Sequence, residues 1–113
     1  RSYIKDAKKN FSMQCYRIVV ISGYAAMFHA GRAILLRDGV KERSHECIPL
    51  YISEMYPALE GTANLLDSFR KERHKALYGL ESEITEEDAR AALEAARVIC
   101  DNIDRFFNNR MSF

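Results

Sequence analysis

Residues 85–106, TEEDARAALEAARVICDNIDRF, decide the fold class of this chain. The segment opens with a threonine followed three residues later by an acid, which is the arrangement of a helix capping box. Apolar side chains then recur at spacings of three and four residues, as Ala89, Ala92, Ala96, Ile99, Ile103 and Phe106. This is the period of a helix that buries one stripe of its surface. The sequence therefore predicts a long amphipathic helix over about residues 85–108, which needs other helices to cover it.

The rest of the chain follows the same helical period. Four further helices are predicted, over about residues 2–11, 13–38, 45–56 and 62–78. Side-chain hydroxyls at the start of the third and fourth helices are expected to cap them, because such groups accept hydrogen bonds from free backbone N–H groups; they belong to Ser44 and Thr62. Most glycines and prolines fall between the helices, at Gly39, Pro57, Gly61 and Gly79. Two more, Gly23 and Gly31, lie inside the second helix, where we expect a neighbouring helix to pack closely.

The composition agrees with a helical domain. The chain has 113 residues, of which 48% are hydrophobic, with only five Gly and two Pro. A many-stranded sandwich or barrel needs more turn residues than this. The sequence therefore predicts one all-α domain over residues 1–113. We expect an antiparallel, up-and-down four-helix bundle with a short additional N-terminal helix, about five helices in all.

Charge is balanced over the whole chain but not along it. The formal net charge is +1, so the general basic footprint of a nucleic-acid-binding protein is absent. Residues 1–17 carry five basic side chains against one acid, whereas residues 81–104 carry eight acids against two arginines. We expect the two ends to pack side by side, so that most of this charge is offset.

The cysteines and histidines show no pattern of a metal or redox site. The three cysteines, Cys15, Cys47 and Cys100, form no C-x-x-C pair, and the three histidines are too widely spaced for a zinc site. We expect free thiols in a reducing cytoplasm, with no metal ion and no cofactor. The longest apolar stretch, residues 18–31, is too short to span a bilayer, so no membrane association is predicted.

The fourth predicted helix carries the most informative anomaly. Its apolar seam steps by three and four residues through Leu66, Phe69, Arg73, Ala76 and Leu80, and one member of that seam is a guanidinium. A charge on an apolar seam is costly unless it is paired, reaches solvent, or faces a pocket or a subunit interface. Arg70, His74 and Tyr78 follow the seam at i, i+4 and i+8. Together these groups suit phosphate contact and base stacking.

Three further polar residues are secondary candidates. His29 and Arg32 interrupt the apolar second helix, and His45 follows the charged connection after it. We expect His29 to be hydrogen-bonded in the core or at an interface. We expect His45 to lie in the exposed first turn of the third helix.

Four segments together resemble a known family. They are SGYAAMFHAGRAILLRDG (22–39), KERSH (41–45), FRKERHKALYG (69–79) and TEEDA (85–89), and they are similar in order and spacing to the small prokaryotic HEPN domains. The resemblance implies a bundle of four or five helices, often dimeric, in a family named for nucleotide binding. Many small members are encoded beside a minimal nucleotidyltransferase, and some such pairs act as toxin and antitoxin. The toxic members are metal-independent ribonucleases with an Arg followed, after four to six residues, by a His.

The local match to that ribonuclease motif is incomplete. Arg73 corresponds to the family's Arg, but Tyr78 stands where the four-spaced form has His. His74 is adjacent to Arg73 and would point about 100° around the helix from it. We therefore favour a non-catalytic module that binds a nucleotide or RNA through Arg70, Arg73, His74 and Tyr78. The alternatives are a ribonuclease with His74 as general acid and base, and a structural or regulatory homodimeric adaptor.

Overall fold

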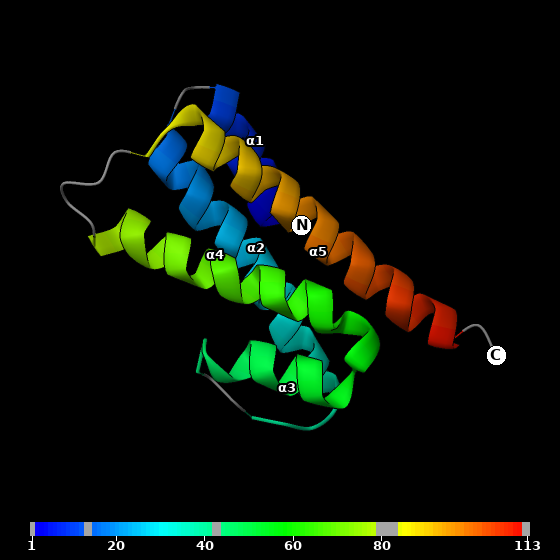
Figure 1. The fold of residues 1–113 in the computed structure, drawn as a ribbon. Helices are drawn as coiled ribbons and strands as arrows, with labels where there is room; N and C mark the ends of the chain where they lie inside the picture. The colour runs from blue at the N-terminus through cyan, green and yellow to red at the C-terminus, as the bar shows by residue number, and fades with distance from the viewer. Residues whose placement is uncertain (1, 13–14, 42–43, 79–83, 112–113) are drawn as a thin grey trace.

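Five α-helices and one turn of 3₁₀ helix form the part of the chain that the structure, a computed structural model, describes (Figure 1). The described residues are 2–12, 15–41, 44–78 and 84–111. The elements are α1 (Ser2–Ser12), α2 (Tyr16–Arg37), α3 (Cys47–Met55), η1 (Pro57–Leu59), α4 (Glu60–Tyr78) and α5 (Glu86–Met111). The predicted all-α helical bundle is confirmed.

The bundle is organised around α2, which packs against α1, α3, α4 and α5. In Figure 1, α2 and α5 run in the same direction, while α1 and α4 run in the opposite direction. The short α3 lies at the end of the bundle where α2 finishes, and it packs against α4. Because α1 packs against both α2 and α5, the basic N-terminal and acidic C-terminal helices lie side by side, as the charge distribution predicted.

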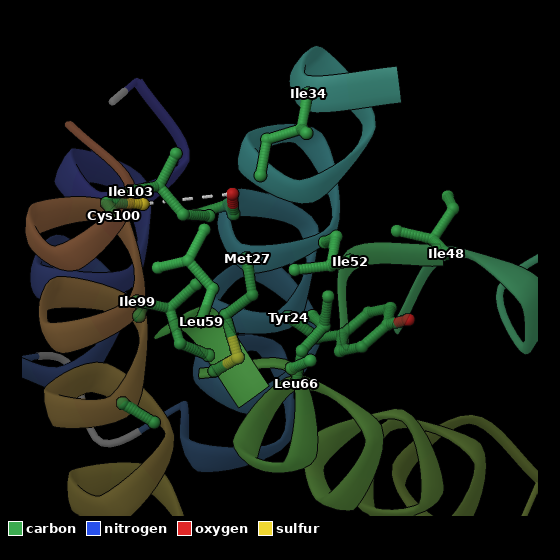
Figure 2. Close-up of a cluster of buried hydrophobic side chains, with 14 of the residues drawn as sticks. Tyr24, Met27, Ile34, Ile48, Ile52, Leu59, Leu66, Ile99, Cys100 and Ile103 are labelled. Atoms are coloured by element: carbon green, nitrogen blue, oxygen red, sulfur yellow. Dashed lines mark hydrogen bonds between the residues drawn. The ribbon is translucent and has the colours of Figure 1, made fainter. Parts of the chain in front are cut away.

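The core joins side chains of all the longer helices. Figure 2 shows Met27 and Ile34 of α2 facing Ile99 and Ile103 of α5, with Leu66 of α4 on another side. Tyr24 belongs to the same cluster, but its hydroxyl points away from the other side chains of the cluster. The largest of these side chains are almost wholly buried, so they fix how the helices are spaced.

Close packing at the two glycines of α2 is confirmed. A Cβ atom on Gly23 would lie 3.3 Å from the backbone oxygen of Ala92 in α5. A Cβ atom on Gly31 would lie 3.0 Å from Leu66 Cδ2 and 3.2 Å from Ile48 Cγ2. All three distances are shorter than ordinary van der Waals contact, so these positions let α5, α4 and α3 approach the backbone of α2.

Two predicted helix ends are also confirmed. The Thr85 N–H donates to Asp88 Oδ2 at 3.1 Å, and the Asp88 N–H donates to Thr85 Oγ1 at 3.2 Å. This reciprocal pair is the capping box that starts α5. After α2, Gly39 has a φ of 79°, a conformation that side chains other than glycine rarely adopt.

Two predicted caps are wrong. Pro57 starts the 3₁₀ turn η1, which runs directly into α4, so α4 begins at Glu60. Thr62 is therefore a buried residue inside the helix, and its Oγ1 accepts a hydrogen bond from Asn102 Nδ2 at 3.3 Å. Ser44 does not cap α3: its Oγ accepts from the Glu46 N–H at 3.2 Å, ahead of a helix that begins at Cys47.

The helix α2 is also long and apolar enough to cross a membrane, judged by length and composition alone. Half of its most apolar window is buried inside the bundle, and four other helices pack on it. The apolar character of α2 is explained by its central place in the core.

Candidate functional site

Arg73 lies where its place on the apolar seam predicted, among residues that are otherwise apolar. Leu66 and Ala76 of the same helix are buried, and Arg73 itself is half-buried. Its guanidinium carbon is 5.6 Å from the centroid of the Tyr24 ring, which is a cation–π distance. Within the described residues, no carboxylate forms an ion pair with Arg73. Its positive charge is therefore supported by an aromatic face and is not neutralised by an acid.

His45 is held against the same tyrosine. The Tyr24 hydroxyl is 2.9 Å from His45 Nδ1, and the His45 ring is stacked on Phe28 with the centroids 3.9 Å apart and the planes 9° from parallel. The histidine lies before α3 and is half-buried, so the expectation of an exposed first-turn position in the third helix is wrong. The reason is that the His45 ring lies against Tyr24 and Phe28 on the side of α2.

Arg70 connects this region to α3. Its Nε donates to Asp67 Oδ1 at 2.9 Å, one turn earlier on α4, and its Nη1 is 3.6 Å from Glu46 Oε1. The two acids fix the position of the guanidinium and offset part of its charge. We refer to Tyr24, Phe28, His45, Arg70 and Arg73 as the arginine–aromatic cluster.

The electrostatics of this cluster favour an anion. Burial raises the pKa of Tyr24 to about 12 despite the nearby Arg73 and Arg70, so its hydroxyl keeps its proton. Burial, together with the positive charges of Arg73 and Arg70, lowers the pKa of His45 below 6.5, so its imidazole is neutral at pH 7. The cluster thus presents the guanidinium of Arg73 and the partly offset guanidinium of Arg70 beside neutral hydrogen-bonding groups and aromatic faces. Such a combination can bind a phosphate and stack on a base.

Comparison with known proteins agrees with the sequence resemblance. The profile of the HEPN domain matches residues 1–106, nearly the whole chain. The chain belongs to the HEPN family. A UPF0332 protein of Archaeoglobus fulgidus is 30% identical over 98 residues, covering 84% of this chain and 78% of that protein. Membership makes this HEPN domain, in general terms, a nucleotide- or RNA-related module.

The four principal site residues of the HEPN domain fall into two pairs in space. Arg70 and Arg73 are both close enough to Tyr24 and His45 for their positive charges to lower the pKa of each group, although burial outweighs this effect at Tyr24. His74 and Tyr78 are exposed and contact each other, with ring centroids 4.8 Å apart. The arginines therefore lie in the arginine–aromatic cluster, while the second pair lies on the open surface of α4.

The secondary candidates of the HEPN domain also separate. His29 is exposed and stacks on Tyr3 of α1, with centroids 5.1 Å apart and planes 5° from parallel, so the expectation of a core histidine is wrong. Arg32 is half-buried, and its Nε is the one buried side-chain nitrogen or oxygen among the described residues with no hydrogen-bond partner. Only His45 of these three belongs to the arginine–aromatic cluster.

Sequence reasoning missed the two aromatic members that α2 supplies to the cluster. No sequence prediction named Tyr24 or Phe28 as a site residue, although they stand at i and i+4 with Arg32 at i+8. That spacing puts the three side chains on one face of the helix, and the third of them is charged. That face marks the edge of the core, where an aromatic ring can face a ligand as well as a neighbour.

Proposed function

We propose that this HEPN domain binds a nucleotide or RNA through the arginine–aromatic cluster and does not catalyse a reaction there. The observation that carries the proposal is Arg73. It is half-buried over the ring of Tyr24, and no described carboxylate pairs with it. A partly exposed guanidinium without a protein carboxylate is free to bind a ligand anion, and phosphate is the anion that a nucleotide supplies.

Binding without catalysis is favoured by the state of the candidate bases. Tyr78 is 65% exposed, and a tyrosine phenol is a poor base near neutral pH. His74 contacts Tyr78, whereas Arg73 lies over Tyr24. A ribonuclease that used Arg73 and His74 together would need both groups at one phosphate.

We also propose that the domain acts in the cytoplasm as a homodimer, with a minimal nucleotidyltransferase as its partner in a toxin–antitoxin context. The support for a second copy is the outward side of α2, where Ile18 and Leu36 are 47% and 57% exposed. Light scattering of the purified protein tests the dimer, and Ile18→Lys with Leu36→Lys should return it to a monomer. Co-purification with the product of a neighbouring nucleotidyltransferase gene tests the partner.

Calorimetric titration tests the ligand. Wild-type protein, Arg73→Met and Arg97→Met should be titrated with ribonucleoside phosphates and with a short RNA. Met keeps the apolar length of the side chain, and Arg97 is an exposed arginine that pairs with Glu94 at 3.4 Å. We expect Arg73→Met to weaken binding at least about tenfold, as expected when one charge-assisted hydrogen bond is lost, and Arg97→Met to leave it unchanged.

The same samples separate the alternatives. Binding that is absent in the wild type, or unchanged in Arg73→Met, contradicts the proposed site. Cleavage of the RNA that is abolished by His74→Ala would favour the ribonuclease. Absence of any response, with a stable complex with another protein, would favour the adaptor.

A further inference from the structure

A pocket opens beside Arg70, between α3 and α4, and Arg70 is the one residue of the arginine–aromatic cluster in its described lining. Its volume is about 390 Å³, and its lining includes Glu46, Pro49, Leu50, Asn64, Asp67 and Arg70. Pockets for small molecules in proteins hold about 300–1,000 Å³. The space is therefore at the small end of that range, as a single nucleoside requires.

The walls of the pocket differ in chemistry. Pro49 and Leu50 of α3 form an apolar side. Leu50 is 63% exposed, because no described residue covers it. Asn64 stands on α4, one turn before Asp67, and its carboxamide has no hydrogen-bond partner among the described residues. An apolar wall suits the face of a base, and a carboxamide offers both a donor and an acceptor to its edge.

Each of the two acids of the pocket has one carboxylate oxygen that does not bind Arg70. Asp67 uses Oδ1 and Glu46 uses Oε1 to hold Arg70. The second oxygen of each carboxylate has no partner in the part of the chain that the structure describes. A carboxylate with a free oxygen accepts hydrogen bonds from vicinal hydroxyls, as acidic residues do for the ribose of bound dinucleotides. The same negative charges would repel a phosphate placed inside the pocket.

Arg70 belongs both to this pocket and to the arginine–aromatic cluster. It lines the pocket, and its charge also lowers the pKa of His45. We propose that the pocket holds the ribonucleoside part of a 5′-mononucleotide, whose phosphate lies against Arg70 and Arg73. This inference rests on the proposed function and names its ligand class: one nucleotide with an intact ribose, bound with its base toward Leu50 and Asn64.

Two comparisons of ligands test the proposal by calorimetry on the full chain. The four ribonucleoside 5′-monophosphates are compared first with their 2′-deoxy forms. Loss of one hydroxyl that bonds a carboxylate should weaken binding about tenfold. They are compared next with a short RNA that has no 5′-phosphate, which we expect to bind more weakly than the best monophosphate.

Matched variants on the exposed side of α4 locate the ligand. Asn64→Ala should weaken the best monophosphate about fivefold to tenfold, since it removes a hydrogen bond to the base. Ser68→Ala, one turn along the same exposed surface, should have no effect, because the Ser68 hydroxyl donates to the backbone carbonyl of Asn64 at 3.1 Å and is not part of the described lining of the pocket. Amide chemical shifts of residues 46–53 and 64–70 should move on titration in the wild type.

The outcomes distinguish this inference from the proposed function. If a monophosphate binds and Arg73→Met abolishes it, but ribose and deoxyribose forms bind equally and Asn64→Ala has no effect, the pocket assignment is overturned while the proposed function stands. Binding of RNA alone, without any mononucleotide, also overturns the pocket assignment. If nothing binds at all, both fail.

Discussion

Replacing Gly31 by alanine tests whether α2 is the helix around which the bundle closes. A Cβ atom there would lie 3.0 Å from Leu66 Cδ2, 3.2 Å from Ile48 Cγ2 and 3.4 Å from Ile52 Cδ1. All three side chains are at most 1% exposed, so none can move out of the way into solvent. Overpacking of this kind costs about 1–3 kcal/mol.

Glycine to alanine also has a favourable effect that must be separated from the steric one. Alanine stabilises the interior of a helix by about 0.5–1 kcal/mol relative to glycine. Gly61, in the first turn of α4, has no atom within 4 Å of its Cβ position, so Gly61→Ala shows the backbone effect with no steric term. We therefore expect Gly31→Ala to be about 1–3 kcal/mol less stable than Gly61→Ala.

Urea unfolding followed by circular dichroism measures both variants against the wild type. Similar slopes with urea would show that the two variants expose the same surface, so that the midpoints can be compared directly. A Gly31→Ala protein as stable as Gly61→Ala would refute the reasoning, because it would mean that α3 and α4 do not approach α2 as closely as the structure shows.

Three further predictions concern the start of α5, the end of α2 and the arginine–aromatic cluster. Thr85→Ala should lower the free energy of unfolding by about 1 kcal/mol in the same urea assay, because it removes one half of the capping box; an unchanged midpoint would contradict the cap. The hydroxyls of Tyr51 and Tyr56 both donate to Asp38 Oδ2, at 2.8 and 2.7 Å. Asp38→Ala should therefore lower the free energy of unfolding by about 1–3 kcal/mol, and the double variant Tyr51→Phe with Tyr56→Phe should lower it by most of that amount. His45 should titrate by NMR below its reference pKa of 6.5, since burial and the nearby arginines disfavour its charged form, and Arg73→Met should raise that value. Because the unfolded chain takes up this proton first, the stability that His45 contributes is present above about pH 6.5 and is lost as the pH falls through the lowered pKa; a His45→Gln variant should lose that pH dependence.

Local signals in the sequence determined most of the fold. The threonine and the acid that start α5 lie three residues apart, and the left-handed turn at Gly39 depends on one residue. Helical periodicity needs only neighbouring residues, so it placed the five helices with small shifts at their ends. The same periodicity singled out Arg73, because a charge interrupts the apolar seam of α4.

The tertiary structure alone decided what surrounds Arg73. Tyr24 and His45 are 21 residues apart in the sequence and meet only in the folded chain. The pocket beside Arg70 needs Glu46 and Leu50 from one element and Asn64 from another. The prediction that Thr62 caps α4 was wrong for a related reason. The 3₁₀ turn that begins at Pro57 continues directly into α4, so the helix starts before Thr62. Periodicity records which side of a helix is apolar, whereas contacts between distant segments depend on the path of the chain between them, and that path is set by packing in the folded bundle.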